Sequence, residues 1–252
     1  MLNSMSGPDH HLAGLCFSNE PTVALWTSSN PHVFSNQSST MVLKLYGNPH
    51  STCTARVRTV IEELSIPYEL VVVDFAKGEH KAPAFTAVQP FGQVPYIDDD
   101  GFKLFESRAI CRYLALKYGG IGKVIPDPKD LQKTALFEQG ASIELSNFDP
   151  FASALGYENV FKPVLGLQTD AAFAEKLKGL LEGKLAGYEA LLGRQKYLAG
   201  DEVTIVDLFH LPYGTLLKMQ SIDFLESDKF PNVKKWWAEI SSRPSWQKVS
   251  AR

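Results

Sequence analysis

The spacing of apolar residues changes its period once along the chain, and this change limits the possible folds. In residues 41–118, short β-prone runs alternate with segments whose apolar residues recur at helical spacing. Residues 119–128 interrupt the pattern with three glycines and two prolines, and only the helical period returns after them. The sequence therefore predicts an α/β domain over residues 41–120, a linker over 121–129 and an all-α domain over 130–252.

Within the α/β domain, two β-prone runs flank one predicted helix. Residues 42–46 form the first run, residues 57–64 carry an apolar helical face, and residues 68–73 form the second run. Because a helix connects the two strands, they are expected to pair in parallel. A hairpin is expected over residues 96–105, since the Asp100-Gly101 pair favours a primed turn.

Three carboxylates lie at the predicted tip of this hairpin. The helix that follows the hairpin is expected to begin at Ser107. Asp98, Asp99 and Asp100 are expected to face solvent rather than bind a metal, since such residues are typical of turns. The helix after Ser107 should bury residues at helical spacing: Ile110, Tyr113 and Leu114, with the aliphatic stem of Lys117.

The all-α domain contains three segments with an apolar face and one short capped helix. Thr204 and Asp207 form a capping box with Asp at the fourth position, which predicts a helix start there and a structural role. The three apolar faces predicted to enter the core are Phe137, Ala141, Leu145 and Phe148; Leu177, Leu180, Leu181, Tyr188 and Leu191; and Val233, Trp236, Trp237 and Ile240.

Residues 1–40 differ in composition from the rest of the 252-residue chain. They contain no Lys or Arg and are rich in polar residues, which predicts a poorly ordered extension. Their apolar runs are too short to cross a membrane, and the adjacent His10 and His11 are expected to be solvated rather than to bind a metal.

The charge and the cysteine count narrow the class of protein further. The net charge of −3 provides no attraction for nucleic acid or an acidic membrane surface. The three cysteines are widely spaced, which argues against a disulfide framework or a metal site and favours a reducing, cytoplasmic setting.

Three loops of the α/β domain carry the residues best suited to chemistry. Ser51 lies at the first turn of a helix, where unpaired N–H groups and the helix dipole favour an anion, although a plain N-cap is the commoner role for a serine there. Residues 92–95 (GQVP) enter a strand and leave the peptide of Val94 free to pair with an extended peptide. Glu106 and Ser107 begin another helix. The three loops are expected to converge on one ligand that carries carboxylates and a peptide backbone.

Four motifs, with their order and spacing, resemble the cytosolic glutathione transferases, most of all the phi class. The motifs are residues 51–56 (STCTAR), 78–85 (GEHKAPAF), 90–95 (PFGQVP) and 105–110 (FESRAI), and residues 231–246 resemble the C-terminal part of the family. The resemblance implies a thioredoxin-like N-terminal domain with the order β-α-β-α-β-β-α, followed by an all-α helical domain. It also implies a cytoplasmic homodimer that acts in detoxification and needs no cofactor besides glutathione as cosubstrate.

The resemblance further implies a role for each matching residue. Ser51 would donate a hydrogen bond to the glutathione sulfur and so favour the thiolate, which is the attacking form. The resemblance implies that His80 and Lys81 face the glycyl carboxylate, Gln93 and Val94 the cysteinyl backbone, and Glu106 and Ser107 the γ-glutamyl end. His50 and Ser51 complete the implied glutathione-binding set. A cis Val94-Pro95 peptide bond is implied as well.

The expected reaction is conjugation of the thiolate to small hydrophobic electrophiles, with glutathione peroxidase as a side activity. The electrophile is expected to lie against aromatic residues of the second domain, although buried rings more often belong to the core. The candidate pocket residues are Phe148, Phe151, Tyr157, Phe161 and Tyr213.

Two other interpretations remain open. Cys53, two positions after Ser51, resembles the zeta-class turn, and a cysteine mechanism would give an isomerase or a thiol transferase; a small buried cysteine is the structural alternative. The same fold could also serve as a non-catalytic binding module or a ligandin-type carrier. Cys111, on an apolar helical face, is expected to lie in the core.

Overall fold

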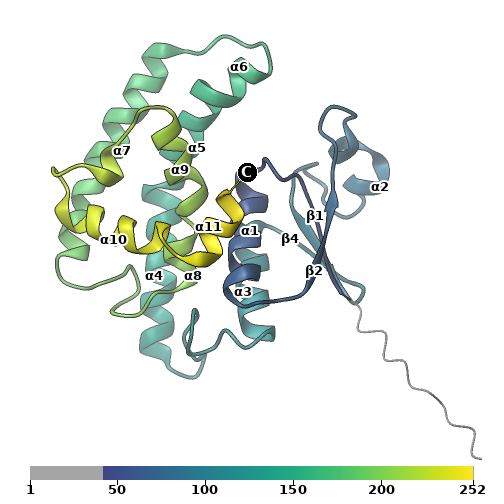
Figure 1. Ribbon diagram of the computed structural model, residues 1–252, viewed down its shortest axis with the longest axis horizontal. Coiled ribbons are helices and arrows are strands. Elements are labelled where there is room, and N and C mark those ends of the chain that lie inside the picture. The colour runs from purple at the N-terminus through teal and green to yellow at the C-terminus, as the bar shows by residue number, and fades with distance from the viewer. Residues whose placement is uncertain (1–41, 252) are drawn as a thin grey trace, which may run out of the picture. The chain divides into compact units, whose positions relative to one another are not determined.

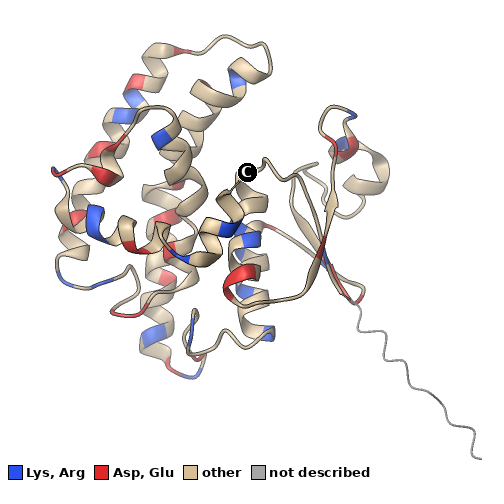
Figure 2. Cartoon of the chain, in the orientation of Figure 1, with Lys and Arg blue, Asp and Glu red and all other residues tan. Residues whose placement is uncertain are grey.

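The computed structural model describes residues 42–251 (Figure 1). The predicted extension over residues 1–40, with His10 and His11, lies outside the described residues. None of the helices within residues 42–251 is long and apolar enough to cross a membrane. Acidic and basic residues are interspersed along both halves of the described chain (Figure 2).

The N-terminal domain is a four-stranded mixed sheet with helices, as predicted. Its strands run in the order β2-β1-β3-β4, with β1 and β2 parallel and β3 antiparallel to both β1 and β4. The predicted parallel pairing is therefore confirmed. The elements are β1 (Leu43–Gly47), α1 (Thr52–Glu63), β2 (Tyr68–Val72), the 3-10 turn η1 (Glu79–Lys81), α2 (Pro83–Thr86), β3 (Tyr96–Asp99), β4 (Phe102–Phe105) and α3 (Ser107–Lys117).

The hairpin turn has the predicted geometry, but one of its carboxylates is buried. Asp100 and Gly101 have φ angles of 56° and 84°, as a primed turn requires. Asp99 is 3% exposed, so the prediction of a solvated side chain is wrong for this residue. It ends β3 with its side chain toward α3, where it accepts hydrogen bonds from Tyr113 (2.7 Å), Lys117 (2.7 Å) and Tyr118 (2.8 Å).

The C-terminal domain is helical, and α1 and α3 lie between its helices and the sheet (Figure 1). Within residues 131–251 the only β-type pairing is the isolated bridge between Tyr197 and Gly200. The elements are α4 (Leu131–Asn147), α5 (Asp149–Gly156), the π-helix η2 (Tyr157–Phe161), α6 (Lys162–Val164), α7 (Ala171–Leu192), α8 (Ile205–Leu208), α9 (Leu211–Met219), the 3-10 turn η3 (Phe224–Glu226), α10 (Pro231–Ser241) and α11 (Pro244–Ser250).

The core follows the predicted apolar faces with two errors. Val233, Trp236, Trp237 and Ile240 of α10 are all buried, as predicted. Leu145 and Leu180 are 52% and 44% exposed, so their assignment to the core is wrong. On α4 the inward position next to Leu145 belongs to Glu144, which is 0% exposed because two arginines face it.

The glycine-rich segment between the domains is itself part of the packing. Val124 and Ile125 are only 4% and 7% exposed, and the Ile205 N–H donates to the Val124 carbonyl at 2.9 Å. The capping box at Thr204 is confirmed. Its Asp207 accepts hydrogen bonds from Thr204 N (2.9 Å), Leu198 N (3.0 Å) and Trp236 Nε1 (2.9 Å), so one buried carboxylate connects α8 with α10.

Gly214 of α9 provides a test of this packing. A Cβ at Gly214 would lie 2.4 Å from Cη2 of Trp237. Since overpacking destabilises by about 1–3 kcal/mol, Gly214→Ala should lower the free energy of unfolding measured in urea. Gly179 of α7 is the control, because a Cβ there would have no neighbour within 4 Å. Gly179→Ala should stabilise by up to about 1 kcal/mol, and equal effects at the two sites would contradict the packing described.

Candidate active site

The turn between β1 and α1 fixes a serine hydroxyl at the start of a helix. The Asn48 side chain holds this turn by donating to the Val73 carbonyl (3.0 Å) and accepting from the His50 N–H (2.9 Å). Ser51 is the N-cap of α1 and accepts from the Thr54 N–H at 3.2 Å. Its own hydroxyl proton can therefore be donated to a ligand. The first turn of α1 contains no acidic residue, so the positive end of the helix dipole is not neutralised.

The segment around η1 supplies two basic side chains and a close backbone approach. Lys81 donates to the Phe91 carbonyl at 3.3 Å. Its chain crosses Gly92, where a Cβ would lie 2.8 Å from Lys81 Cδ and where φ is +59°. His80 stacks edge-on against Phe75 with a centroid separation of 4.9 Å. The Nδ1 of His80 is buried without a partner among the described residues, so a ligand could provide one.

The segment before β3 presents backbone groups. The Gln93 N–H donates to Oε1 of the buried Gln89 at 3.1 Å, which anchors the segment, while the Gln93 side chain is exposed. Val94 is half-buried, and the Val94-Pro95 peptide bond is cis, as the resemblance implied.

The start of α3 exposes an acid beside a buried hydroxyl. Glu106 has φ +71°, a conformation that is rarely adopted outside glycine and that is found at functional sites. Its side chain is exposed and does not cap the helix. Ser107 is buried, and its hydroxyl accepts from Arg56 Nη1 at 3.1 Å.

Strand register brings three of these loops to one end of the sheet. Tyr46 of β1 lies opposite Tyr96 of β3, which lies opposite Phe105 of β4. The chain therefore leaves β1 toward Ser51, enters β3 from Val94 and leaves β4 toward Glu106 at the same end. The Val73 N–H donates to the Gly47 carbonyl at 3.0 Å, so the segment that leads to η1 begins there as well.

A cluster of four charges, two of them buried, lies behind this end of the sheet, and the sequence patterns did not reveal it. Arg56 and Glu144 are 1% and 0% exposed. Arg108 donates to both Glu144 oxygens (2.7 and 2.8 Å) and pairs with Asp149 at 2.7 Å. Arg56 pairs with Asp149 at 3.2 Å and donates to the Phe209 carbonyl at 3.2 Å. The cluster thus connects α1 and α3 with α4, α5 and the residue that follows α8.

Electrostatics keep this cluster charged. Burial alone would raise the pKa of Glu144, but hydrogen bonds from Arg108 and the charge of Arg56 lower it below the usual 4.5. The pKa of Arg108 is raised, since its two carboxylate partners outweigh the burial that would lower it. The sequence did contain one signal of this cluster: Glu144 is a charged residue inside an otherwise apolar helical period.

The two described cysteines differ in environment. Cys53 is half-buried, and its sulfur accepts from Arg56 Nη1 at 3.6 Å. Cys111 is buried, as predicted, and burial raises the pKa of its thiol to about 12, which leaves it unreactive. Among residues 42–251, no three His, Cys, Asp or Glu side chains gather as a metal site would need.

The predicted pocket aromatics do not all lie in one place. Phe148 is 1% exposed and packs 4.7 Å from the ring of His210, whose pKa burial lowers to about 4. It is therefore a core residue rather than part of a pocket wall. Phe151 and Tyr213 are partly buried against the core, Phe161 is half-buried, and Tyr157 is 45% exposed in η2.

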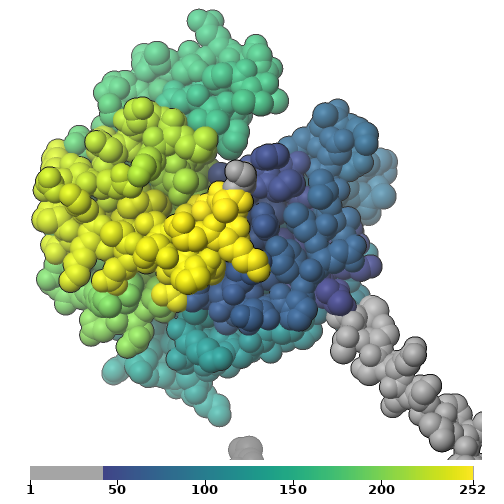
Figure 3. Space-filling model, in the orientation of Figure 1, coloured from purple at the N-terminus to yellow at the C-terminus, as the bar shows by residue number. Residues whose placement is uncertain are grey.

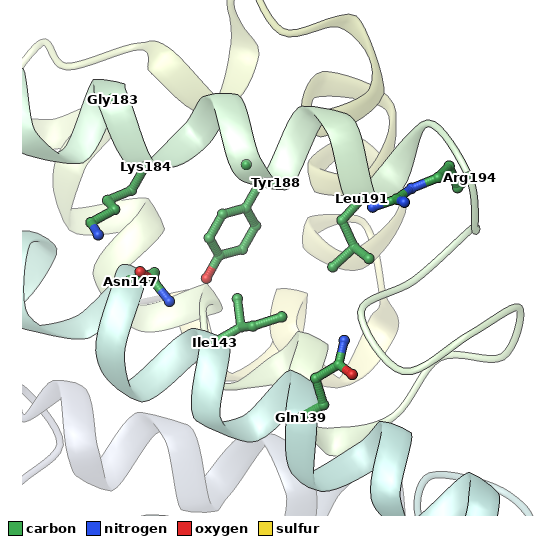
Figure 4. A pocket seen from close by; sticks show the side chains of 9 residues that line it. Gln139, Ile143, Asn147, Gly183, Lys184, Tyr188, Leu191 and Arg194 are labelled. Atoms are coloured by element: carbon green, nitrogen blue, oxygen red, sulfur yellow. The ribbon is translucent and has the colours of Figure 1, made fainter.

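A hollow separates the N-terminal domain from the lobe that contains α5 and α6 (Figure 3). The atoms coloured purple in Figure 3, which belong to the first described residues, lie at the base of this hollow. A second depression, a groove of about 380 Å³ between α4 and α7, lies on another part of the helical domain (Figure 4). The N-terminal end of α1 lies beside the hollow (Figures 1 and 3), whereas the groove is lined by α4 and α7.

Together, the thioredoxin-like sheet, the helical domain and a serine at the α1 N-terminus define a two-domain fold with a polar site at a helix terminus. Residues 41–116 match the family description "Glutathione S-transferase, N-terminal domain", and residues 148–244 match "Glutathione S-transferase, C-terminal domain". The chain belongs to the glutathione S-transferase family, which confirms the resemblance.

Individual relatives agree with this assignment. Glutathione S-transferase PM239X14 of Arabidopsis thaliana is 48% identical over 200 residues, 79% of this chain and 91% of the relative. The crystal structure of glutathione transferase F7 from Populus trichocarpa is 40% identical with a TM-score of 0.78, covering 83% of this chain and 98% of that one. Glutathione S-transferase I from mais, in complex with an atrazine glutathione conjugate, is 34% identical with a TM-score of 0.75, covering 83% and 97%. The similarity to phi-class proteins is confirmed.

The charge cluster yields a prediction about stability. Glu144→Ala would leave the buried guanidinium of Arg56 and the partly buried guanidinium of Arg108 short of a carboxylate, which should lower the free energy of unfolding by about 3–5 kcal/mol. Glu138 of the same helix pairs with Arg112 but is 55% exposed. Glu138→Ala should therefore cost no more than about 1 kcal/mol. Urea denaturation of both variants at neutral pH makes the comparison, and similar losses would contradict the role of burial.

The pH dependence gives a second measurement. Because the folded-state pKa of Glu144 is lowered, its contribution is complete above the usual carboxyl value of 4.5 and is lost as the pH falls through the folded value. The wild-type protein should therefore lose stability more steeply below about pH 4.5 than Glu144→Gln, whose amide does not titrate in this range. Parallel curves would show that Glu144 is not held as a carboxylate.

Proposed function

We propose that the chain conjugates the thiolate of glutathione to small hydrophobic electrophiles, with glutathione as cosubstrate and no other cofactor. The observation that carries the proposal is the Ser51 hydroxyl, whose oxygen accepts from Thr54 N while its proton remains free at the N-terminus of α1. The attacking atom belongs to glutathione, and Ser51 stabilises it without forming a bond to it. We also propose that the enzyme works in the cytoplasm, as expected for this family.

The Ser51 hydroxyl and the N-terminus of α1 together can supply the free energy needed to lower the pKa of the glutathione thiol. A free thiol has a pKa of about 8.5 and is mostly protonated at neutral pH. Lowering that pKa by about two units needs about 2.7 kcal/mol of preferential stabilisation of the thiolate. One charge-assisted hydrogen bond supplies about 1.5–3 kcal/mol, and the helix N-terminus adds about 0.3–1 kcal/mol.

The remaining glutathione contacts follow from the residues at this end of the sheet. The glycyl carboxylate would meet His80, with its unpaired Nδ1, and the ammonium group of Lys81. The cysteinyl backbone would pair with the Val94 peptide. The γ-glutamyl ammonium would meet the exposed Glu106 carboxylate, and its carboxylate the free N–H groups where α3 begins.

The electrophile would enter the hollow beside α5 and α6. Its apolar wall would come from Phe151, Phe161, Tyr157 and Tyr213, which are all partly or wholly exposed, unlike Phe148. Glutathione S-transferase I from mais, which binds an atrazine glutathione conjugate, supports a conjugating role for a chain of this fold.

Ser51→Ala tests the proposal directly. Removing the donor should lower kcat/KM for a chlorodinitroarene by at least about tenfold. It should also raise the pKa of bound glutathione, measured by ultraviolet absorbance of the thiolate. Loss of the N-cap should reduce stability by only about 1 kcal/mol, so the variant should fold.

Cys53→Ala is the matched control two residues away on the same helix turn. It should retain near wild-type conjugation, because Cys53 receives only a weak 3.6 Å contact from Arg56. Activity that survives in Ser51→Ala and disappears in Cys53→Ala would replace this proposal with a cysteine mechanism. Glutathione binding without turnover of several electrophiles by the wild-type protein would indicate a carrier.

We further propose that the protein is a homodimer. Phe91 is 65% exposed on the loop before β3. The groove between α4 and α7 has an apolar floor that includes Ile143, Tyr188 and Leu191 (Figure 4). In a twofold dimer each copy can place Phe91 against the groove of the other, and burying one such ring contributes about 1.5–3 kcal/mol.

Light scattering coupled to size-exclusion chromatography tests this arrangement. Phe91→Ser should raise the dimer dissociation constant at least about tenfold, since two rings are lost per dimer and 1.4 kcal/mol corresponds to a factor of ten. Val164→Ser is the control, because Val164 is 80% exposed on α6, away from the groove. If both variants associate like the wild type, Phe91 does not contribute to the dimer.

A further inference from the structure

Tyr213 lies where the two domains meet beside the start of α1. It belongs to the first turn of α9, which contacts both α1 and α5. Thr52, the residue directly after Ser51, and Cys53 both lie close enough to the Tyr213 phenol to influence its pKa. Of the aromatics considered for the electrophile, Tyr213 is thus the one whose polar end faces the turn that carries Ser51.

The ring of Tyr213 is held in place on two sides. The guanidinium carbon of Arg56 lies 5.7 Å from the ring centroid. Arg56 is itself fixed by Phe209 O and Asp149. On another side is Gly156 of α5, where a Cβ would lie 3.8 Å from Tyr213 Cε1. The hydroxyl is therefore preorganised rather than carried on a mobile side chain.

The protonation state makes this hydroxyl a donor. Burial, followed by the nearby Cys53, raises the pKa of Tyr213 to about 12, so the phenol stays protonated at neutral pH. Within residues 42–251 no acceptor lies at hydrogen-bond distance from Tyr213, yet its oxygen is not among the buried unpaired atoms. Its proton is free to be donated to a ligand.

We propose that Tyr213 donates a hydrogen bond to the electrophile and that the site thereby favours α,β-unsaturated carbonyl compounds. This inference rests on the proposed function, because it requires a glutathione thiolate beside Ser51. In these electrophiles the carbonyl oxygen gains a full negative charge as sulfur adds, and a fixed donor stabilises that charge more than it stabilises the neutral carbonyl.

The reaction balances without any further reagent. Glutathione first releases its thiol proton to solvent. The thiolate sulfur then forms a bond to the β-carbon of the enone, and the carbon–carbon π pair moves to give an enolate oxygen. Tyr213 hydrogen-bonds this oxygen and keeps its own proton. Water returns one proton to the α-carbon, which yields the thioether and restores the carbonyl.

Tyr213→Phe tests the inference, since it keeps the ring and removes only the hydroxyl. With phenylbutenone as the enone, kcat should fall at least about tenfold with little change in KM, because the bond forms mainly in the transition state. With benzyl chloride, an electrophile that carries no oxygen, kcat should stay within about twofold of the wild-type value. The thiolate absorbance of bound glutathione should be unchanged.

Tyr68→Phe is the matched control, because Tyr68 lies opposite Leu43, at the end of β1 that is far from Ser51, and the change also removes one phenolic hydroxyl. It should leave both rates within about twofold of wild type. Equal losses on the enone and benzyl chloride in Tyr213→Phe, or no loss on either, would overturn the role of Tyr213. A wild-type enzyme that conjugates benzyl chloride but not the enone would overturn it too while leaving conjugation intact. Inactivity toward every electrophile would instead overturn both proposals.

Discussion

The ion cluster of Arg56, Arg108, Glu144 and Asp149 is the constraint on which the rest of the structure depends. Two of its members are almost completely buried, and a buried charge is tolerated only beside its partners. Separating the domains would therefore expose or unpair charges as well as apolar surface. Because Arg56 lies one turn beyond Ser51 on α1, the cluster that joins the domains also fixes the helix that presents the serine.

α1 is held along its whole length by groups from both domains. Its N-terminus is set by the Asn48 turn, and its middle by Arg56. At its C-terminal end Glu63 binds Arg243 and Ser245, and Glu62 pairs with Lys248 at 2.6 Å, so α11 is attached there. A helix fixed at three points can hold a hydroxyl in one position, which is what stabilisation of a thiolate requires.

Periodicity and turn chemistry sufficed to predict the parallel strand pair, the primed hairpin turn, the α10 face and the Ser51 cap. They failed where one polar side chain finds buried partners far away in the sequence. Glu144, and not Leu145, points into the core, because Arg56 and Arg108 lie opposite Glu144. Asp99 was buried because Tyr113, Lys117 and Tyr118 converge on it. A pattern of residue types contains no information on such pairings, which arise only when the helices are packed.

The same limit explains why the aromatic residues could not be sorted from the sequence. Phe148 and Tyr213 both belong to the helical domain, but Phe148 contacts the neutral ring of His210, whereas Tyr213 lies close to Thr52 of α1. The difference comes from their neighbours and not from their spacing. In the proposed reaction this difference makes the hollow chemically asymmetric: Ser51 donates to the attacking sulfur, and Tyr213 donates to an atom of the electrophile. Two hydroxyls on opposite reactants can act in one transition state without competing, because each meets charge on a different atom.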